Sequence, residues 1–240
     1  MNYRPKKVAV LGSGVMGSGI ACHLANVGMD VIMLDIVTPK LSDNDSKSKF
    51  HRNKLVNSAL QKTIKSKPAP LYHKSFTSRI KTGNFEDDFD KISESDWIIE
   101  VVVENLEIKK QIFEKVDKHR KNGSLVSSNT SSIPINLLAQ DCSNDFKSCF
   151  CGTHFFNPVR YLKLLEIIPI EETQKEVIDF FMEFGKVKLG KQTVLCKDTP
   201  AFIGNRIGVM SATEMTLLTE KYEFGIEEVD AMTGSLIGRP

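Results

Sequence analysis

The sequence has 240 residues, a net charge of +2, 41% apolar residues and 26% charged residues. These values are ordinary for a globular protein of one large domain, or of one domain and part of another. They give no global attraction to nucleic acid, and no apolar run approaches the roughly 20 residues that span a membrane. The five cysteines form no C-x-x-C pair. We therefore expect reduced thiols in a cytoplasmic protein, with no secretory signal.

The beginning of the chain predicts a β-α-β unit. Residues 7–11 are an apolar strand, residues 18–27 a helix of small and apolar residues, and residues 30–35 a second strand. Strands joined in this way run parallel, with a right-handed crossover.

A G-x-G-x-x-G pattern joins the first strand to the helix. It consists of Gly12, Gly14 and Gly17, with Val15 and Met16 before the last glycine. The first glycine permits a tight turn, the second lets backbone approach a pyrophosphate, and the third lets the helix pack closely on the strand. Free N–H groups at the helix N-terminus favour phosphate. This context predicts a dinucleotide site, and the alternative is a glycine turn without a ligand.

Asp35 ends the second strand, 23 residues after Gly12. A carboxylate at this place accepts hydrogen bonds from ribose hydroxyls and repels a 2′-phosphate. The next residue is Ile36 and not an arginine. The sequence therefore predicts NAD, and not NADP, as the cofactor.

Strands and helices alternate along most of the remaining chain. A polar stretch over residues 43–67 is predicted as a long exposed helix or a helical pair, and residues 83–95 as an acidic turn region. Further strands are expected at residues 97–103, 124–128, 150–155, 164–168 and 194–197, with helices at 108–119 and 173–185. This order predicts an α/β fold with a Rossmann-like, doubly wound, mostly parallel sheet.

His154 and Glu166 are the candidate proton-transfer pair. Each lies in a different apolar strand, and burying an ionised group there is costly without a partner. If the strands are neighbours, Glu166 orients the imidazole. His154 takes the alcohol O–H proton while hydride leaves the carbon that bears the hydroxyl for nicotinamide. The alternative is a structural contact between strands. Cys151 and His154 also form a C-x-x-H pair, but no second ligand pair accompanies it, and we expect no metal site.

Several polar residues follow predicted strands at the carboxyl edge of the sheet, where such folds bind ligands. Asn129 and Ser131 could hold a substrate oxygen there, or belong to a loop that caps a helix. Glu104 is either a contact on the nicotinamide side or a helix N-terminal acid. Asn205 is a lone amide in an apolar helix. Basic residues between Lys47 and Lys81 are either an exposed charged face or contacts for a phosphate-bearing substrate.

Six ordered motifs resemble the L-3-hydroxyacyl-CoA dehydrogenase family, with the likeness strongest to the dehydrogenase part of bacterial multifunctional fatty-acid-oxidation enzymes. The similarity runs from about Lys6 to Pro240. The motifs are Gly12–Ala21, Val103–Leu106, Ser128–Ser132, Thr153–Pro158, Lys163–Glu166 and Lys197–Pro200.

The resemblance implies oxidation of L-3-hydroxyacyl-CoA to 3-ketoacyl-CoA with NAD, in fatty-acid β-oxidation. It implies His154 as the base with Glu166 as its partner, and Ser131 and Asn205 as contacts of the substrate. It places Glu104, Lys109 and Asn129 near the nicotinamide and its ribose.

We expect residues 1–197 to form the NAD-binding domain and residues 198–240 to begin a helical substrate and dimerisation domain that is incomplete. Helices are predicted at residues 200–220 and 226–233. Forty residues of helix cannot bury a core of their own. The resemblance implies that this part completes the acyl site and makes a homo-oligomer, so we expect these 240 residues alone to be weakly active or inactive.

Two other functions fit part of the pattern. One is a dehydrogenase for a 3-hydroxy acid without CoA. The other is a non-catalytic NAD-binding module, which would keep the glycines and Asp35 but would not need His154 near Glu166.

Overall fold

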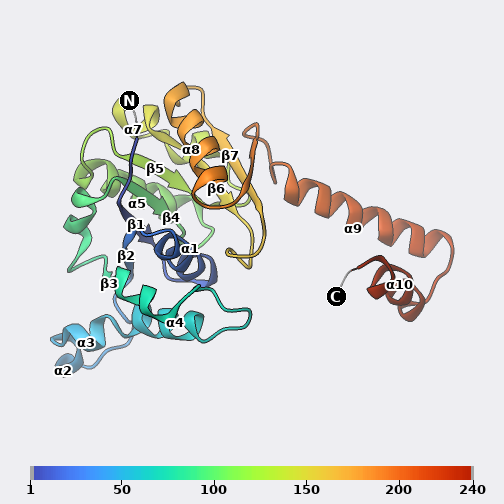
Figure 1. Cartoon of the computed structure of the whole chain (residues 1–240), viewed down its shortest axis with the longest axis horizontal. Helices are drawn as coiled ribbons and strands as arrows, with labels where there is room; N and C mark the ends of the chain where they lie inside the picture. Colours follow the sequence, from blue (N-terminus) through green and yellow to red (C-terminus); the bar gives the residue numbers. More distant parts are fainter. Residues whose placement is uncertain (1–2, 239–240) are drawn as a thin grey trace. The chain divides into compact units, whose positions relative to one another are not determined.

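The computed structural model describes residues 3–238. The chain divides into two compact units, Met1–Pro200 and Ala201–Pro240. The division falls three residues after the boundary expected from the sequence. Figure 1 shows both units, which are described separately below.

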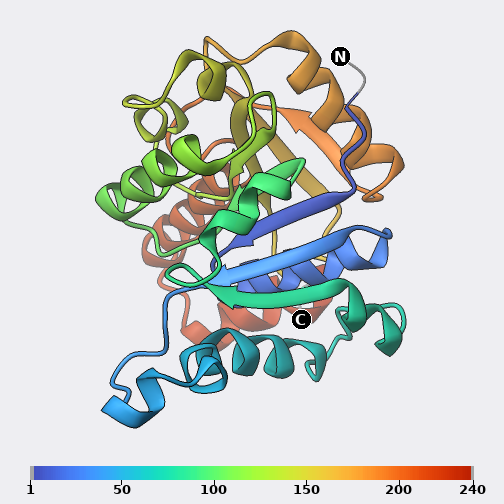
Figure 2. The same ribbon diagram turned by 90° about the vertical axis from the view of Figure 1, so that its left-hand side faces the viewer.

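The first unit is built on a twisted sheet that contains eight strands in the described chain, in the order β3-β2-β1-β4-β5-β6-β7-β8. All neighbouring pairs run parallel except β6 and β7, which are antiparallel. Figure 2 shows β1, β2 and β3 side by side and pointing the same way. The strands are β1 Lys7–Leu11, β2 Asp30–Asp35, β3 Ile80–Asn84, β4 Trp97–Glu100, β5 Leu125–Ser128, β6 Phe150–Phe155, β7 Leu164–Pro169 and β8 Gln192–Leu195.

Helices cover both faces of this sheet, as expected for a doubly wound α/β fold. On one face, α1 and α8 share a core with β1 and β4, where the ring of Trp97 packs edge-on against Phe181. On the other face, Phe113 of α5 and Phe146 of α7 pack on Phe150 of β6. The helices of this unit are α1 Val15–Asn26, α2 Asp43–Ser46, α3 Lys49–Arg52, α4 Lys54–Ile64, α5 Leu106–His119, α6 Ile135–Leu138, α7 Asn144–Ser148 and α8 Lys175–Val187, with 3-10 turns η1 Lys74–Arg79 and η2 Phe89–Glu94.

Several local predictions differ from the structure. The long helix or helical pair expected over residues 43–67 is instead three helices, α2, α3 and α4, and Ser42 caps the first of them. Strand β3 was not predicted. Strand β4 ends at Glu100 and not at 103, because the Glu100 carboxylate accepts a hydrogen bond from the Val102 N–H in place of a strand partner.

The second unit contains α9 (Gly204–Lys221), α10 (Ile226–Thr233) and a 3-10 turn η3 (Ser235–Ile237). The first helix was predicted from Pro200, but Ala201 and Phe202 have positive φ angles of 63° and 48°, so the helix starts after them. Before this helix, the Asp198 carboxylate accepts the N–H groups of Ile135 and Asn136.

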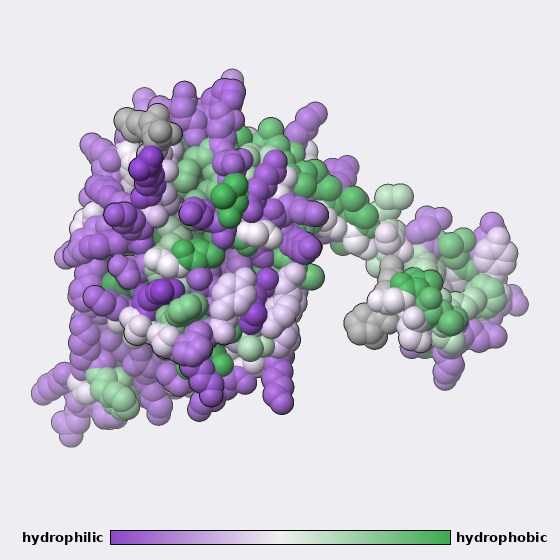
Figure 3. All heavy atoms as spheres, in the orientation of Figure 1, coloured by the Kyte–Doolittle hydropathy of each residue, from purple (hydrophilic) through white to green (hydrophobic). Residues whose placement is uncertain are grey.

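The surface of the second unit is rich in apolar side chains (Figure 3). The exposed large apolar residues of its two helices are Ile207, Val209, Met210, Leu217, Leu218, Ile226 and Met232. Within residues 3–238, no helix has the length and apolar character needed to cross a membrane.

Candidate functional site: a dinucleotide pocket beside a histidine–glutamate pair

The glycine pattern forms the turn between β1 and α1. Gly12 has φ of 111°, and a Cβ there would lie 2.5 Å from the Val101 carbonyl oxygen. A Cβ on Gly17 would lie 2.0 Å from the Gly12 carbonyl oxygen. At Gly14, by contrast, nothing lies within 4 Å. The first and third glycines are thus required by packing, whereas the second leaves open space.

That open space faces the N-terminus of α1, which starts at Val15 and has no side chain capping its first N–H groups. Unpaired N–H groups and the positive end of a helix dipole stabilise a phosphate. The turn therefore fits a pyrophosphate.

Asp35 lies at the carboxyl end of β2, close to the glycine turn. Its Oδ2 accepts hydrogen bonds from the backbone N–H and the hydroxyl of Ser13, at 2.6 and 2.5 Å. Its Oδ1 accepts the N–H of Ile36 at 2.7 Å. The role of Ser13 in fixing this carboxylate was not predicted, although its place between two of the glycines was a usable signal.

A cavity of about 730 Å³ lies at the carboxyl ends of the central strands. Eight of the nine residues predicted to bind the cofactor line it, and so does Ser131. Gly17 is not in its lining, in keeping with a glycine that serves helix packing. The lining residues from the prediction are Gly12, Gly14, Val15, Met16, Asp35, Glu104, Lys109, Asn129 and Ser131.

Glu104 holds the loop after β5. Its Oε1 accepts the N–H groups of Ser131 and Ser132, at 3.0 and 3.2 Å, and the hydroxyls of Thr130 and Ser132. Burial raises the pKa of Glu104, but these donors and Lys109 outweigh it and hold the pKa below its usual value. Glu104 is thus an anion that shapes the loop carrying Ser131.

His154 and Glu166 are directly opposite each other on β6 and β7. The His154 Nδ1 lies 2.7 Å from the Glu166 Oε2, and the two residues are 4% and 0% exposed. With Nδ1 donating to the carboxylate, Nε2 of the neutral ring carries the lone pair that accepts a proton. The pairing expected from two separate strands is present.

Asn129 connects the cofactor cavity to this pair. It lines the cavity, and its Oδ1 accepts the N–H of Phe155, the residue after His154, at 2.9 Å. Asn205 lies in the first turn of α9, in the second unit.

Sequence reasoning missed the two residues that lie beneath Lys109. The Lys109 Nζ lies 2.7 Å from the Glu100 Oε1, and the Ser128 hydroxyl lies 2.5 Å from the Glu100 Oε2. All three side chains are buried. The available signal was Glu100 itself, because it is a charged residue within the apolar strand predicted at residues 97–103. A charged side chain that is buried in such a strand requires a partner.

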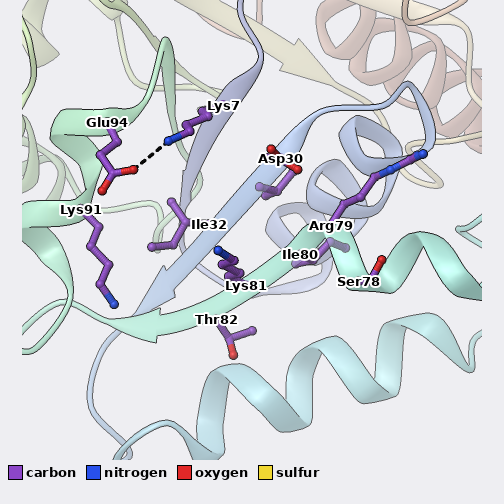
Figure 4. A pocket seen from close by; sticks show the side chains of 11 residues that line it. Lys7, Asp30, Ile32, Ser78, Arg79, Ile80, Lys81, Thr82, Lys91 and Glu94 are labelled. Atoms are coloured by element: carbon purple, nitrogen blue, oxygen red, sulfur yellow. Dashed lines mark hydrogen bonds and ion pairs between the residues drawn. The ribbon is translucent and has the colours of Figure 1, made fainter.

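Two of the other cavities in the first unit are lined by charged side chains. One, of about 350 Å³, borders the glycine turn at Gly14 and carries Lys62 and Arg160. The other, of about 630 Å³, lies at the amino ends of β1 and β2, away from the glycine turn, and Figure 4 shows the ion pair between Lys7 and Glu94 beside it. Across residues 3–238, no cluster of three or more His, Cys, Asp or Glu side chains is placed to bind a metal.

A parallel sheet with a glycine turn after β1 and an acid after β2 defines the class of dinucleotide-binding α/β proteins. Residues 7–199 match the sequence model described as 3-hydroxyacyl-CoA dehydrogenase, NAD binding domain. The chain belongs to this family, whose cofactor is the one predicted from Asp35.

Similar proteins agree with this assignment. A probable 3-hydroxyacyl-CoA dehydrogenase of Bacillus subtilis is 54% identical over all of this chain, which covers 31% of that protein. The mitochondrial hydroxyacyl-coenzyme A dehydrogenase of Sus scrofa is 35% identical, with 94% of this chain and 69% of that protein covered. The crystal structure of (S)-3-hydroxybutyryl-CoA dehydrogenase from Ralstonia eutropha has a TM-score of 0.74 and 30% identity, with 94% and 75% covered.

The chain is shorter than the relatives it matches. It spans about a third of the Bacillus subtilis protein and 65% of a probable 3-hydroxyacyl-CoA dehydrogenase of Deinococcus radiodurans, to which it is 42% identical.

Proposed function

We propose that this chain is the cofactor-binding and proton-transferring part of an NAD-dependent 3-hydroxyacyl-CoA dehydrogenase that acts in fatty-acid β-oxidation. The observation that carries the proposal is the His154–Glu166 pair, buried on strands next to the dinucleotide cavity and linked to it through Asn129. A module that only binds NAD would not need this pair.

In the proposed reaction, NAD supplies a hydride acceptor. His154 takes the hydroxyl proton of the substrate on Nε2, while Glu166 holds Nδ1 and stabilises the protonated ring. Ser131 binds the same substrate oxygen, from a loop fixed by Glu104. Asn205, in the first turn of α9, is kept as a further proposed catalytic residue. Metal ligands are not part of this scheme.

The cofactor is bound by the residues from Gly12 to Gly17 at its pyrophosphate and by Asp35 at its adenosine ribose. With Asp35 on the adenosine side, the residues on the β4 and β5 side of the glycine turn would hold the nicotinamide half. Lys109, Glu104 and Asn129 line the cavity on that side.

The substrate is proposed to carry CoA because the cavity beside Gly14 bears Lys62 and Arg160, cations that suit its phosphates. The rival substrate, a 3-hydroxy acid without CoA, carries no phosphates for these cations to bind. The printed names of the relatives support the CoA form.

We also propose a cytoplasmic homo-oligomer in which the apolar helix α9 packs on a neighbouring chain. The exposed side chains of Ile207, Met210 and Leu217 support this, since isolated apolar helices are unstable in water. A monomeric protein with a disordered α9 in solution would contradict the proposal.

The test of function uses excess protein over substrate, because we expect slow turnover from these residues alone. NADH binding is measured by fluorescence, and NADH oxidation is followed after addition of acetoacetyl-CoA. The expected result is tight NADH binding with slow oxidation that disappears in His154→Ala. Absence of NADH binding, or oxidation that does not depend on His154, would exclude the proposed reaction. Full activity of the 240 residues would refute the expected weak activity.

A further inference from the structure

Glu100 is a buried carboxylate that the proposed proton transfer does not use. It ends β4, is 0% exposed, and accepts hydrogen bonds from the Lys109 ammonium, the Val102 N–H and the Ser128 hydroxyl. All three partners donate, which is the environment of a carboxylate anion. Burial raises the pKa of Glu100 above its usual value, and Lys109, Ser128 and the Val102 N–H oppose that rise by stabilising the anion. Buried ion pairs add little net stability, so the fold alone does not explain this one.

The first route from Glu100 to the cavity runs through Lys109. The Lys109 Nζ lies 2.7 Å from the Glu100 Oε1 and 3.2 Å from the Glu104 Oε2. The other oxygen of Glu104 binds the N–H groups of Ser131 and Ser132. Lys109 is therefore shared between two carboxylates. Glu104 faces the loop after β5, and Glu100 holds Glu104 in place through Lys109.

The second route runs through Ser128. Its hydroxyl donates to the Glu100 Oε2 at 2.5 Å and accepts the N–H of Thr130 at 3.2 Å. Glu100 and Ser128 are opposite each other on β4 and β5, so both side chains lie on the same face of the sheet. Glu100 is thus connected to the loop that contains Asn129 and Ser131 by two routes, one through Lys109 and Glu104 and the other through Ser128.

We infer that Glu100 is a positioning residue for the nicotinamide half of the cofactor site. It holds Lys109 and Ser128, and through them it sets the loop that presents Asn129 and Ser131 to the cavity. This inference rests on the proposed function, because it assigns the nicotinamide to the β4–β5 side. On the adenosine side, the hydrogen bonds of Asp35 go to Ser13 and Ile36, and none of them reaches Glu100, Lys109 or Ser128.

The separation of the two halves gives a readout that a purely structural role would not move. NADH needs both halves of the site, whereas ADP-ribose needs only the adenosine and pyrophosphate half. In Glu100→Gln we expect about tenfold weaker NADH binding, since a charge-assisted contact is lost. We expect ADP-ribose binding to stay within about twofold of the original protein.

Glu94→Gln is the matched control. Glu94 also pairs with a lysine, Lys7, at 2.8 Å, but this pair is exposed and lies at the amino ends of the strands (Figure 4). Removal of an exposed pair costs little. Binding of both ligands should remain unchanged in this variant.

The outcomes separate the inference from the proposed function. If the original protein binds neither NADH nor ADP-ribose, the proposed function fails. If it binds both, and Glu100→Gln weakens both equally or neither, the positioning role is overturned. Should Glu100→Gln not fold, Ser128→Ala replaces it, because this change removes one route and leaves the Lys109 pair. Ser128→Ala must then weaken the binding of NADH relative to the binding of ADP-ribose. An unchanged ratio of the two dissociation constants overturns the inference.

Discussion

The imidazole Nδ1 of His154 lies 2.7 Å from the carboxylate Oε2 of Glu166, and the two residues are opposite each other in the antiparallel pair of β6 and β7. An antiparallel partner places the two Cβ atoms about 5 Å apart on the same face of the sheet. The strand register therefore brings the imidazole and the carboxylate together.

Replacement of His154 by glutamine should remove the proton acceptor and keep most of the side-chain volume. We expect NADH oxidation with acetoacetyl-CoA to fall by about 10²–10⁴-fold, the usual contribution of a general acid–base group. The dissociation constant for NADH should remain the same, because His154 is not in the lining of the cavity. A single-turnover measurement beside an NADH titration checks both. A parallel loss of NADH binding would argue for a structural histidine.

Replacement of Glu166 by glutamine should weaken catalysis and stability together. The neutral amide replaces a charge-assisted contact with His154, and the difference is about 1.5–3 kcal/mol for a hydrogen bond to a charged group. The rate should fall by about tenfold to a hundredfold at unchanged NADH affinity. Urea unfolding should show a loss of similar size, since Glu166 is fully buried. An unchanged rate with lowered stability would reduce the pair to a packing contact.

The β-α-β unit and the strand of His154 could be predicted because their signals are local. Apolar runs bounded by glycine or proline give the strands, and the spacing of Gly12, Gly14 and Gly17 gives the turn. Strand β3 could not be predicted in this way. It is an edge strand with one large apolar residue, Ile80, and its partner is β2, about 50 residues earlier.

The site was predictable as a set of residues but not as a network. Glu104 and Ser131 were both singled out, each for a contact with a ligand. The structure shows them bound to each other, across 27 positions of sequence. Glu100 was missed because its partner Lys109 comes from a helix that packs over the sheet, and no strand periodicity reports such a contact.

Asp35 should decide between the two nicotinamide dinucleotides. Its carboxylate lies where a 2′-phosphate would be repelled, so Asp35→Ala should raise the affinity for NADPH relative to NADH by at least about tenfold. Asp30→Ala, at the amino end of the same strand, is the control and should leave the ratio as it is. Titrations of NADH and NADPH into the original protein and the two variants give the ratio of the two dissociation constants for each protein. An unaltered ratio in Asp35→Ala would exclude Asp35 as the ribose acid.

His23 should make the first unit less stable in mild acid. It is 2% exposed on α1, and its Nε2 donates to the Leu189 carbonyl oxygen at 3.0 Å, which leaves the neutral ring as the buried form. Burial and the charge of Lys191 lower the pKa of His23 to about 4, although the Leu189 carbonyl opposes them. In the unfolded chain the pKa of this histidine is near its ordinary value of about 6.5. Between the two pKa values the unfolded chain therefore binds the proton more readily than the folded protein does.

Stability should therefore fall as the pH drops from about 6.5 to about 4, by about 3 kcal/mol from this one group. His23→Leu removes the titrating ring, so its free energy of unfolding should decline much less over that range, whatever its value at neutral pH. His73→Leu changes an exposed histidine and should follow the original protein. Urea unfolding at a series of pH values measures all three. Equal pH slopes for the original protein and His23→Leu would show that His23 is not the group responsible.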